Sequence, residues 1–275
     1  MRLKRLAAVT LSMVMALTMT AYANDADAVA VFQEMEAKNN AMTDVDTYYD
    51  FNMDMRSGSE HMGARLEMNM KANNLTTPEQ MRMNTYMRMT LTDTGSMGTE
   101  GGPGETGVAV DLSGTAITAN LYYADNMYYM DMLGSKVKMP VPLSEMMENV
   151  KQTTGMMSTS LDYVQNLKLR TEGEDRILSF TMDASKMNSL LDQVMGSMQS
   201  LTGSANSNVS YRDISCEYIV NPEGYCTKTK MKMTMDMKVE DQTVTVTLDG
   251  DVGYANPGQP VTITAPNLAE YTLAE

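Results

Sequence analysis

The sequence predicts a mainly β fold of the α+β class, with about a dozen strands and three helices. Two observations lead to this prediction: long segments in which apolar and polar residues alternate, and short turns that bring successive segments close enough to pair antiparallel. Alternation with a period of two places all the apolar side chains of a strand on one face. We therefore expect a sheet with one buried face and one solvent-facing face.

Three of the alternating segments lie in the first half of the chain, over Thr47–Arg56, His61–Ala72 and Gln80–Asp93. Methionine is frequent in all three, although it intrinsically prefers helices. A helix would spread residues spaced by two around its whole circumference, so the alternation outweighs the propensity. The apolar positions are Tyr49, Phe51, Met53 and Met55 in the first segment, Met62, Ala64, Leu66, Met68, Met70 and Ala72 in the second, and Met81, Met83, Met87, Met89 and Leu91 in the third.

Apolar residues with helical spacing mark three other segments. We expect helices over Ala26–Lys38, over a short stretch capped by Ser144, and over Ser185–Leu201. A glycine-rich stretch without lysine, residues 94–107, is expected to form a surface loop. The remaining strands are predicted at Val108–Leu112, Ala116–Tyr123, Met127–Met132, Lys136–Val141, Tyr163–Arg170, Arg176–Met182, Gln242–Val252 and Pro260–Ala265.

The two cysteines lie in a predicted hairpin over Tyr211–Val239, which turns at the residues Asn-Pro-Glu-Gly. In the simplest register Cys226 lies opposite Val220. Cys216 then lies opposite Lys230, four residues away along the strand or roughly 13 Å. A disulfide requires Cα atoms within about 7 Å, yet an oxidising compartment would favour a bond. The sequence therefore does not decide whether Cys216 and Cys226 form a disulfide.

The N-terminus has the three-part layout of a secretory signal peptide. Three basic residues among the first five precede the uncharged, mostly apolar run Leu6–Thr20, and small residues follow at Ala21 and Ala23. This run is shorter than the roughly 20 residues that a membrane-spanning helix needs. We expect cleavage after Ala23, export, and a single domain over residues 24–275, with an uncleaved N-terminal anchor as the alternative.

Composition argues against several classes of function. With 21 Lys and Arg against 35 Asp and Glu, the formal net charge is −14, which disfavours nucleic acid as a partner. One His and two Cys are too few for the usual zinc site of His and Cys ligands. A Ser-His-Asp or Cys-His catalytic site would have to use the one histidine of the chain. Sugar-processing clefts usually present aromatic platforms, but this chain has no Trp. Of two adjacent tyrosines on a strand, such as Tyr122 and Tyr123, we expect one in the core and the other at the surface. We expect no enzyme activity and no cofactor.

The 32 methionines suggest a role beyond ordinary packing. The clearest run, Met231 to Met237, alternates methionine with polar residues. Thioether side chains repack easily, so a methionine-lined cavity adapts to varied apolar shapes. A methionine-rich packed core is an alternative, and so is a soft-metal site, because thioethers select Cu(I). The spread of methionines over many strands, with His61 expected to be solvated, argues against copper.

Several segments carry a resemblance to a known family. These are the N-terminal helix, the stretch Leu121–Met130 with its paired tyrosines, the turn and strand Gly134–Lys138, and the closing segment Gly258–Pro266. With a mid-chain amphipathic helix, this pattern resembles the extracytoplasmic LolA-like proteins of Gram-positive bacteria. These are relatives of the LolA/LolB lipoprotein carriers and of the LppX/LprG lipid-binding lipoproteins.

The resemblance implies an unclosed antiparallel half-barrel whose concave face, partly covered by helices, receives an acyl chain or another apolar ligand. Many such proteins carry a cysteine directly after the signal peptide for lipid attachment, whereas Asn24 stands there in this chain. The expected partner is thus a lipid or apolar ligand held by a monomer without a lipid anchor. The alternative is a scaffold or regulatory protein that binds a cell-envelope protein through its surface.

The alternation also predicts which residues form the ligand-binding face. If the sheet curls without closing, the buried faces of its strands line a groove that the helix over Ser185–Leu201 covers in part. The predicted ligand-binding residues are Phe51, Met53, Met55, Leu66, Met68, Met70, Met83, Met87, Met89, Met233 and Met235.

Overall fold

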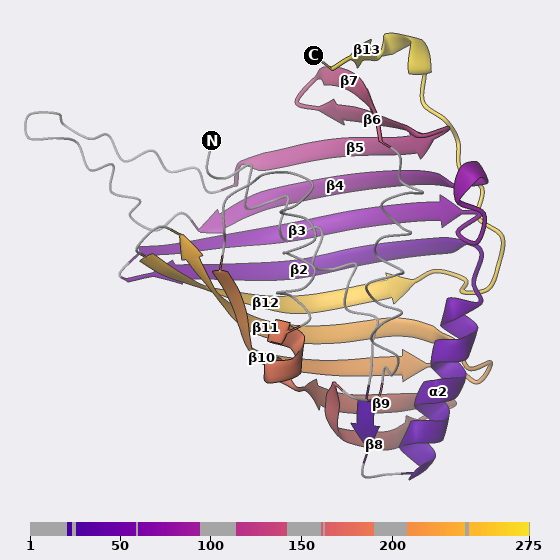
Figure 1. Ribbon diagram of the computed structural model, residues 1–275, viewed down its shortest axis with the longest axis vertical. Helices are drawn as coiled ribbons and strands as arrows, with labels where there is room; N and C mark the ends of the chain where they lie inside the picture. Colours follow the sequence, from indigo (N-terminus) through magenta and orange to yellow (C-terminus); the bar gives the residue numbers. More distant parts are fainter. Residues whose placement is uncertain are drawn as a thin grey trace, which may run out of the picture.

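The computed structural model describes residues 21–23, 26–58, 60–93, 114–141, 161, 163–189, 208–239 and 242–274. These residues form one sheet of 13 strands with a long helix, α2, on it (Figure 1). The elements are β1 (Ala21–Ala23), α2 (Ala26–Asn40), β2 (Val45–Ser57), β3 (Glu60–Asn73), η1 (Pro78–Gln80), β4 (Arg82–Asp93), β5 (Ala116–Ala124), β6 (Met127–Met132), β7 (Ser135–Pro140), β8 (Val164–Glu172), β9 (Asp175–Met182), β10 (Asn208–Val220), β11 (Cys226–Val239), β12 (Gln242–Tyr254), η3 (Leu268–Glu270) and β13 (Thr272–Leu273).

The strands lie in the order β1-β8-β9-β10-β11-β12-β2-β3-β4-β5-β6-β7-β13. Two antiparallel meanders, β2–β7 and β8–β12, meet where β12 pairs with β2. Among the described strands, the two at the ends of this order do not pair with each other, so the sheet is unclosed. The expected antiparallel half-barrel of the α+β class is therefore confirmed.

Helix α2 packs on one face of the sheet, called the inner face from here on. It buries Ala28, Phe32 and Met35, which lie on one side of the helix at intervals of three to four residues. The ring of Phe32 lies edge-on to Phe180 of β9, with centroids 6.0 Å apart, and stacks on Tyr218 of β10 at 6.1 Å. The helix thus covers the β8–β10 end of the inner face.

Apolar side chains line up in rows across the inner face. One row leads from Cys216 to Met231 and Gly250 and on to Phe51 and Leu66, each opposite the next in register. Along β2 the burial alternates over nearly the whole strand, which confirms the predicted alternation. Full burial of a large apolar side chain contributes about 1.5–3 kcal/mol, so each buried residue of these rows stabilises the fold.

The opposite face, called the outer face, is charged and faces solvent. Arg65 of β3 forms two hydrogen bonds of 2.8 and 2.7 Å with Asp50 of β2, and Lys71 lies 3.0 Å from Asp46. The bonds from Arg65 hold the pKa of Asp50 below its ordinary value. Exposed pairs of this kind contribute about 0–1 kcal/mol each, so they add little to the stability of the sheet.

The predicted strand Pro260–Ala265 is wrong, since these residues lack regular structure. Val261 donates its backbone N–H to the Asp44 carboxylate at 2.7 Å, and its carbonyl accepts from the Asn73 side chain at 3.2 Å. Pro260 has no backbone N–H to give to a strand ladder. Side chains therefore hold this segment where the prediction expected strand pairing.

The hairpin of β10 and β11 has the predicted turn but a different register. Val220 lies opposite Cys226 as expected, whereas Cys216 lies opposite Met231 instead of Lys230. The register shifts next to the turn, where Thr227 is an extra residue on β11 and its hydroxyl donates to the Ile219 carbonyl at 3.2 Å. A β-bulge adds one residue to one strand, and an extra residue of this kind cannot be read from alternation.

Both ends of the sheet are covered by short parallel strands from the two ends of the chain. β1 pairs with β8, and β13 pairs with β7 (Figure 1). At the β7 end, the ring of Tyr271 lies edge-on to Tyr129 with centroids 5.4 Å apart, on the outer face. Tyr129 in turn contacts Tyr122 at 5.9 Å. This C-terminal cover buries Tyr122, so Tyr122 and Tyr123 are both buried, whereas the alternation predicted that one of the two would lie at the surface.

Some predictions lie wholly or partly outside the described residues. The loop over residues 94–107, the strand Val108–Leu112 and the helix at Ser144 are outside them. Of the predicted helix Ser185–Leu201, residues up to 189 are described and helical from 184. Its cap is Asp183, whose carboxylate accepts from the N–H groups of Ser185 and Lys186 at 3.0 and 3.2 Å. No helix in the described ranges is long and apolar enough to cross a membrane.

Candidate ligand-binding face

All eleven predicted residues lie on the inner face, and the structure brings ten of them into one apolar cluster. Seven are buried, with at most 7% of each side chain exposed, and three are half-buried. Met83 belongs to a second, smaller cluster with Ala72, Met81 and Tyr123, which Met70 also contacts. The buried seven are Phe51, Met53, Met55, Leu66, Met68, Met233 and Met235, and the half-buried three are Met70, Met87 and Met89.

The β8–β12 part of the inner face is packed core. Met233 and Met235 are fully buried there, and burial raises the pKa of Tyr211 and of the Cys216 thiol to about 12 each. Helix α2 closes this end through the contacts of Phe32 with β9 and β10. These residues hold the sheet together and leave little surface for a ligand.

The β4–β7 part of the same face is more open. Met87 and Met89 are half-buried, and in register with them lie apolar residues of β5, β6 and β7 that are half-buried as well. The prediction had missed these neighbours, although they lie in the predicted strands Ala116–Tyr123, Met127–Met132 and Lys136–Val141. The additional apolar residues are Ile117, Leu121, Met130, Met132, Val137 and Met139.

In the described strands β4, β5, β6 and β7, no charged side chain lies on the inner face. The polar residues there are Thr85, which is buried, Tyr123, Tyr128 and the exposed Ser135 at the start of β7. Charges of the same strands, such as Arg88 and Lys136, fall on the outer face by alternation. An uncharged, partly accessible apolar surface is suited to an acyl chain and unsuited to an ionic ligand.

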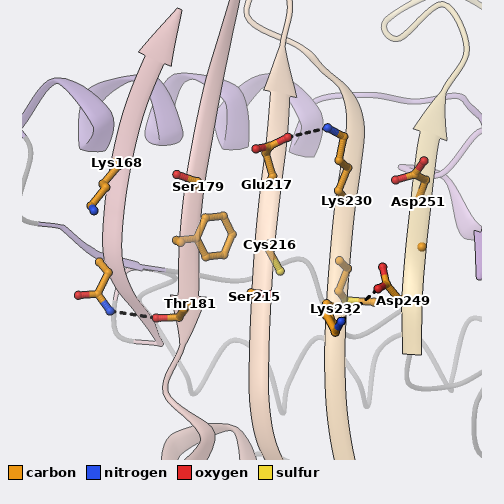
Figure 2. A pocket seen from close by; sticks show the side chains of 14 residues that line it. Lys168, Ser179, Thr181, Ser215, Cys216, Glu217, Lys230, Lys232, Asp249 and Asp251 are labelled. Atoms are coloured by element: carbon orange, nitrogen blue, oxygen red, sulfur yellow. Dashed lines mark hydrogen bonds and ion pairs between the residues drawn. The ribbon is translucent and has the colours of Figure 1, made fainter. Parts of the chain in front are cut away.

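A hollow lies on the outer face, over β8–β12. It has a volume of about 530 Å³ and a lining of both signs of charge (Figure 2). Lys230 bonds to Glu217 at 2.8 Å and Lys232 lies 3.4 Å from Asp249, so the charges at its rim neutralise each other. Figure 2 shows these side chains on the side of the strands that faces away from α2. This hollow is distinct from the predicted apolar groove.

The comparison with family models gives one match, which covers residues 27–270: DUF6612, a family of unknown function. The chain belongs to the DUF6612 family. A search of the curated proteins found no match for it.

Solved structures similar to this DUF6612 chain include two mycobacterial proteins. LprF from Mycobacterium bovis is 12% identical, with 88% of this chain and 98% of that chain covered and a TM-score of 0.42. The lipoprotein LppX from Mycobacterium tuberculosis is 9% identical over 88% of this chain and 100% of that chain, with a TM-score of 0.38. A DUF1329 family protein from Desulfovibrio piger is 9% identical, covers 83% of this chain and 90% of its own, and has a TM-score of 0.27.

The described methionines of the DUF6612 chain meet in few direct pairs across the candidate ligand-binding face. Met68 lies opposite Met87, and Met55 opposite Met62, while Met70 and Met89 lie opposite residues of other types. The described residues contain no group of three or more His, Cys, Asp or Glu side chains arranged to hold a metal ion. The thioethers thus follow the apolar rows of the sheet.

Proposed function

We propose that this DUF6612 chain is an exported, non-enzymatic binding protein that holds a lipid acyl chain or another apolar ligand against the β4–β7 part of its inner face. One observation carries the proposal: that part of the face is apolar, uncharged and half-buried, whereas the β8–β12 part is packed core. Flexible methionine side chains such as Met87 and Met130 let the surface adapt to different chain shapes.

The energy available on this surface is sufficient for binding. Burying one methylene group contributes about 0.8 kcal/mol, so a chain of about eight carbons could contribute several kcal/mol before the costs of ordering. Affinity would then rise with acyl length until the apolar surface ends. Native mass spectrometry of the protein purified without detergent tests the proposal first, since a co-purifying lipid should appear as a bound mass.

A matched pair of variants on β5 tests the location. Leu121→Asn places an amide on the apolar face, while Thr118→Asn places the same group at an exposed outer position. Burying an amide without a partner costs about 1–3 kcal/mol. Leu121→Asn should therefore weaken binding of a fluorescent fatty acid about tenfold. Thr118→Asn should leave it unchanged. Equal affinities for both variants, with both folded by circular dichroism, would contradict the location.

A second pair of variants separates lipid binding from thioether–metal binding. Met53→Leu and Met87→Leu keep volume and apolarity but remove the sulfur atoms, so they should fold normally. Fatty-acid binding should survive both changes. Loss of Cu(I) affinity in these variants, together with undetectable lipid binding in the unchanged protein, would favour a metal site instead.

A further inference from the structure

The β8 end of the sheet differs from the β7 end in what covers it. At β7 the cover, β13, lies within the expected mature chain, and Ala274 adds a backbone bond of 2.8 Å to the Lys138 carbonyl. At β8 the cover is β1, with Ala21 opposite Val164 and Ala23 opposite Leu167. The sequence predicts signal-peptide cleavage after Ala23. Cleavage there removes β1 and leaves the backbone groups of one edge strand without their partner.

We propose that, after cleavage, the free edge of β8 binds an extended segment of another cell-envelope protein, parallel to β8 and with an acidic residue beside Lys168. Addition of a strand to an exposed edge is a common mode of peptide recognition, in which backbone bonds give affinity and side-chain positions give specificity. In the structure, β1 occupies this position in the way such a segment would.

The surroundings of β1 restrict what can bind there. Helix α2, which begins three residues after β1, comes within 8 Å of both β1 and β8 between Cα atoms. Val164 and Leu167 of β8 are at most 1% exposed beside it. Ala21 and Ala23 are the β1 residues in register with them.

Charge argues for a partner segment and against a second copy of the chain. Two β8 strands paired antiparallel about Leu169 would place Lys168 opposite Arg170, and like charges directly opposite are destabilising. In a parallel segment, the position after the one opposite Leu167 lies beside the exposed Lys168. An acidic residue at that position matches the lysine.

Hydrogen exchange tests whether the edge becomes free. Two forms of the chain are compared, residues 24–275 and residues 21–275, after N-terminal sequencing of exported protein has located the cleavage site. Fragments covering residues 163–172 should exchange faster in the 24–275 form, and fragments covering β7 should be equal in both. Equal exchange at β8, or exported protein that retains Ala21–Ala23, would overturn the proposal.

Peptide binding tests the occupant. The probe is an acetylated peptide with the sequence of residues 18–25 and Asp in place of Asn24, and the matched control has Lys there. The Asp peptide should bind the 24–275 form several-fold more tightly than the Lys peptide and should not bind the 21–275 form. Lys168→Glu should reverse this preference, and Lys138→Glu at the covered edge should not. Absence of binding to the 24–275 form, or a concentration-dependent dimer of that form in ultracentrifugation, would refute it.

Discussion

At the scale of single residues, His61 shows how the outer face is tied together. Its Nε2 lies 2.6 Å from the Asp54 carboxylate on β2, and its Nδ1 lies 3.2 Å from Asp93 on β4. The expectation of a merely solvated imidazole was therefore incomplete, although 34% of the side chain is exposed. Arg56 donates to the same Asp54 at 2.7 Å, and this bond is the main reason why the pKa of Asp54 lies below its ordinary value.

Asp54→Asn should lower stability at neutral pH and lose its effect in acid. A carboxylate whose pKa is lowered on folding stabilises the protein above its unfolded pKa, and this contribution disappears as the pH falls through the folded pKa. Because the group is partly exposed, the loss at pH 7 should be below about 1 kcal/mol. Urea unfolding at pH 7 and in acid measures it. A difference between the two proteins that grows in acid would contradict the assignment.

The thiols of Cys216 and Cys226 are free and buried in the structure. Burial raises the pKa of Cys216 to about 12 and of Cys226 to about 11, so very little thiolate is present near neutral pH. We expect both to resist iodoacetamide at pH 8 in the folded protein. Both should react after unfolding without reductant, as mass spectrometry can show. Two unmodified cysteines in the unfolded, non-reduced chain would instead demonstrate a disulfide.

At the scale of elements, period-two alternation located the long strands of the sheet but not β1 and β13, because a sheet with one buried face imposes the pattern directly on the sequence of its longer strands. What it could not reveal depends on contacts between distant segments. Tyr122 is buried because Tyr271 and Tyr129 cover the outer face there. The bulge at Thr227 is likewise invisible in the alternation, and so are the bonds that hold Val261 to Asp44 and Asn73.

The candidate site was predictable to a similar extent. Alternation placed all eleven predicted residues together on the inner face, but it could not separate the packed β8–β12 part from the open β4–β7 part. That distinction depends on the position of α2 over Phe180 and Tyr218, which only the folded chain reveals. Residues such as Leu121 therefore became candidates once their exposure was known.

Gly250 should be a sensitive position on β12. A Cβ there would lie 2.7 Å from the Cα of Phe51 and closer still to the Asp50 carbonyl, so β2 and β12 would have to move apart. Overpacking of this kind costs about 1–3 kcal/mol. Gly250→Ala should lower the urea midpoint accordingly, while Asp249→Ala on the exposed side of the same strand should change it little. Equal midpoints for Gly250→Ala and the unchanged protein would contradict this close approach.

At the scale of the whole molecule, the C-terminal segment protects an edge of the sheet. It combines the short β13–β7 pairing with the buried ring of Tyr271, and Lys136 forms an ion pair with Glu270. Exposed edge strands are sites of intermolecular pairing. The segment therefore contributes to solubility as well as to stability.

Truncation after Asn267 should destabilise the protein and promote its self-association. The truncated chain loses the Tyr129–Tyr271 contact, worth about 0.5–1.5 kcal/mol beyond its buried area. Light scattering at matched concentrations should show larger particles than the full chain gives. Tyr271→Phe keeps the ring and the β13 pairing, so it should behave like the unchanged protein. A truncated chain that stays monomeric and equally stable would disprove this role.

The pairing of β12 with β2 has a consequence for the time order of folding. The two strands are neighbours in the middle of the sheet but come from opposite ends of the chain. Each meander can form from local hairpins, whereas their junction requires closing a very long loop, which slows folding. In the export that we propose, the β2 edge would therefore stay unpaired until almost the whole polypeptide had crossed the membrane. In that interval the nascent protein is exposed to aggregation, so its yield should depend on how quickly translocation finishes.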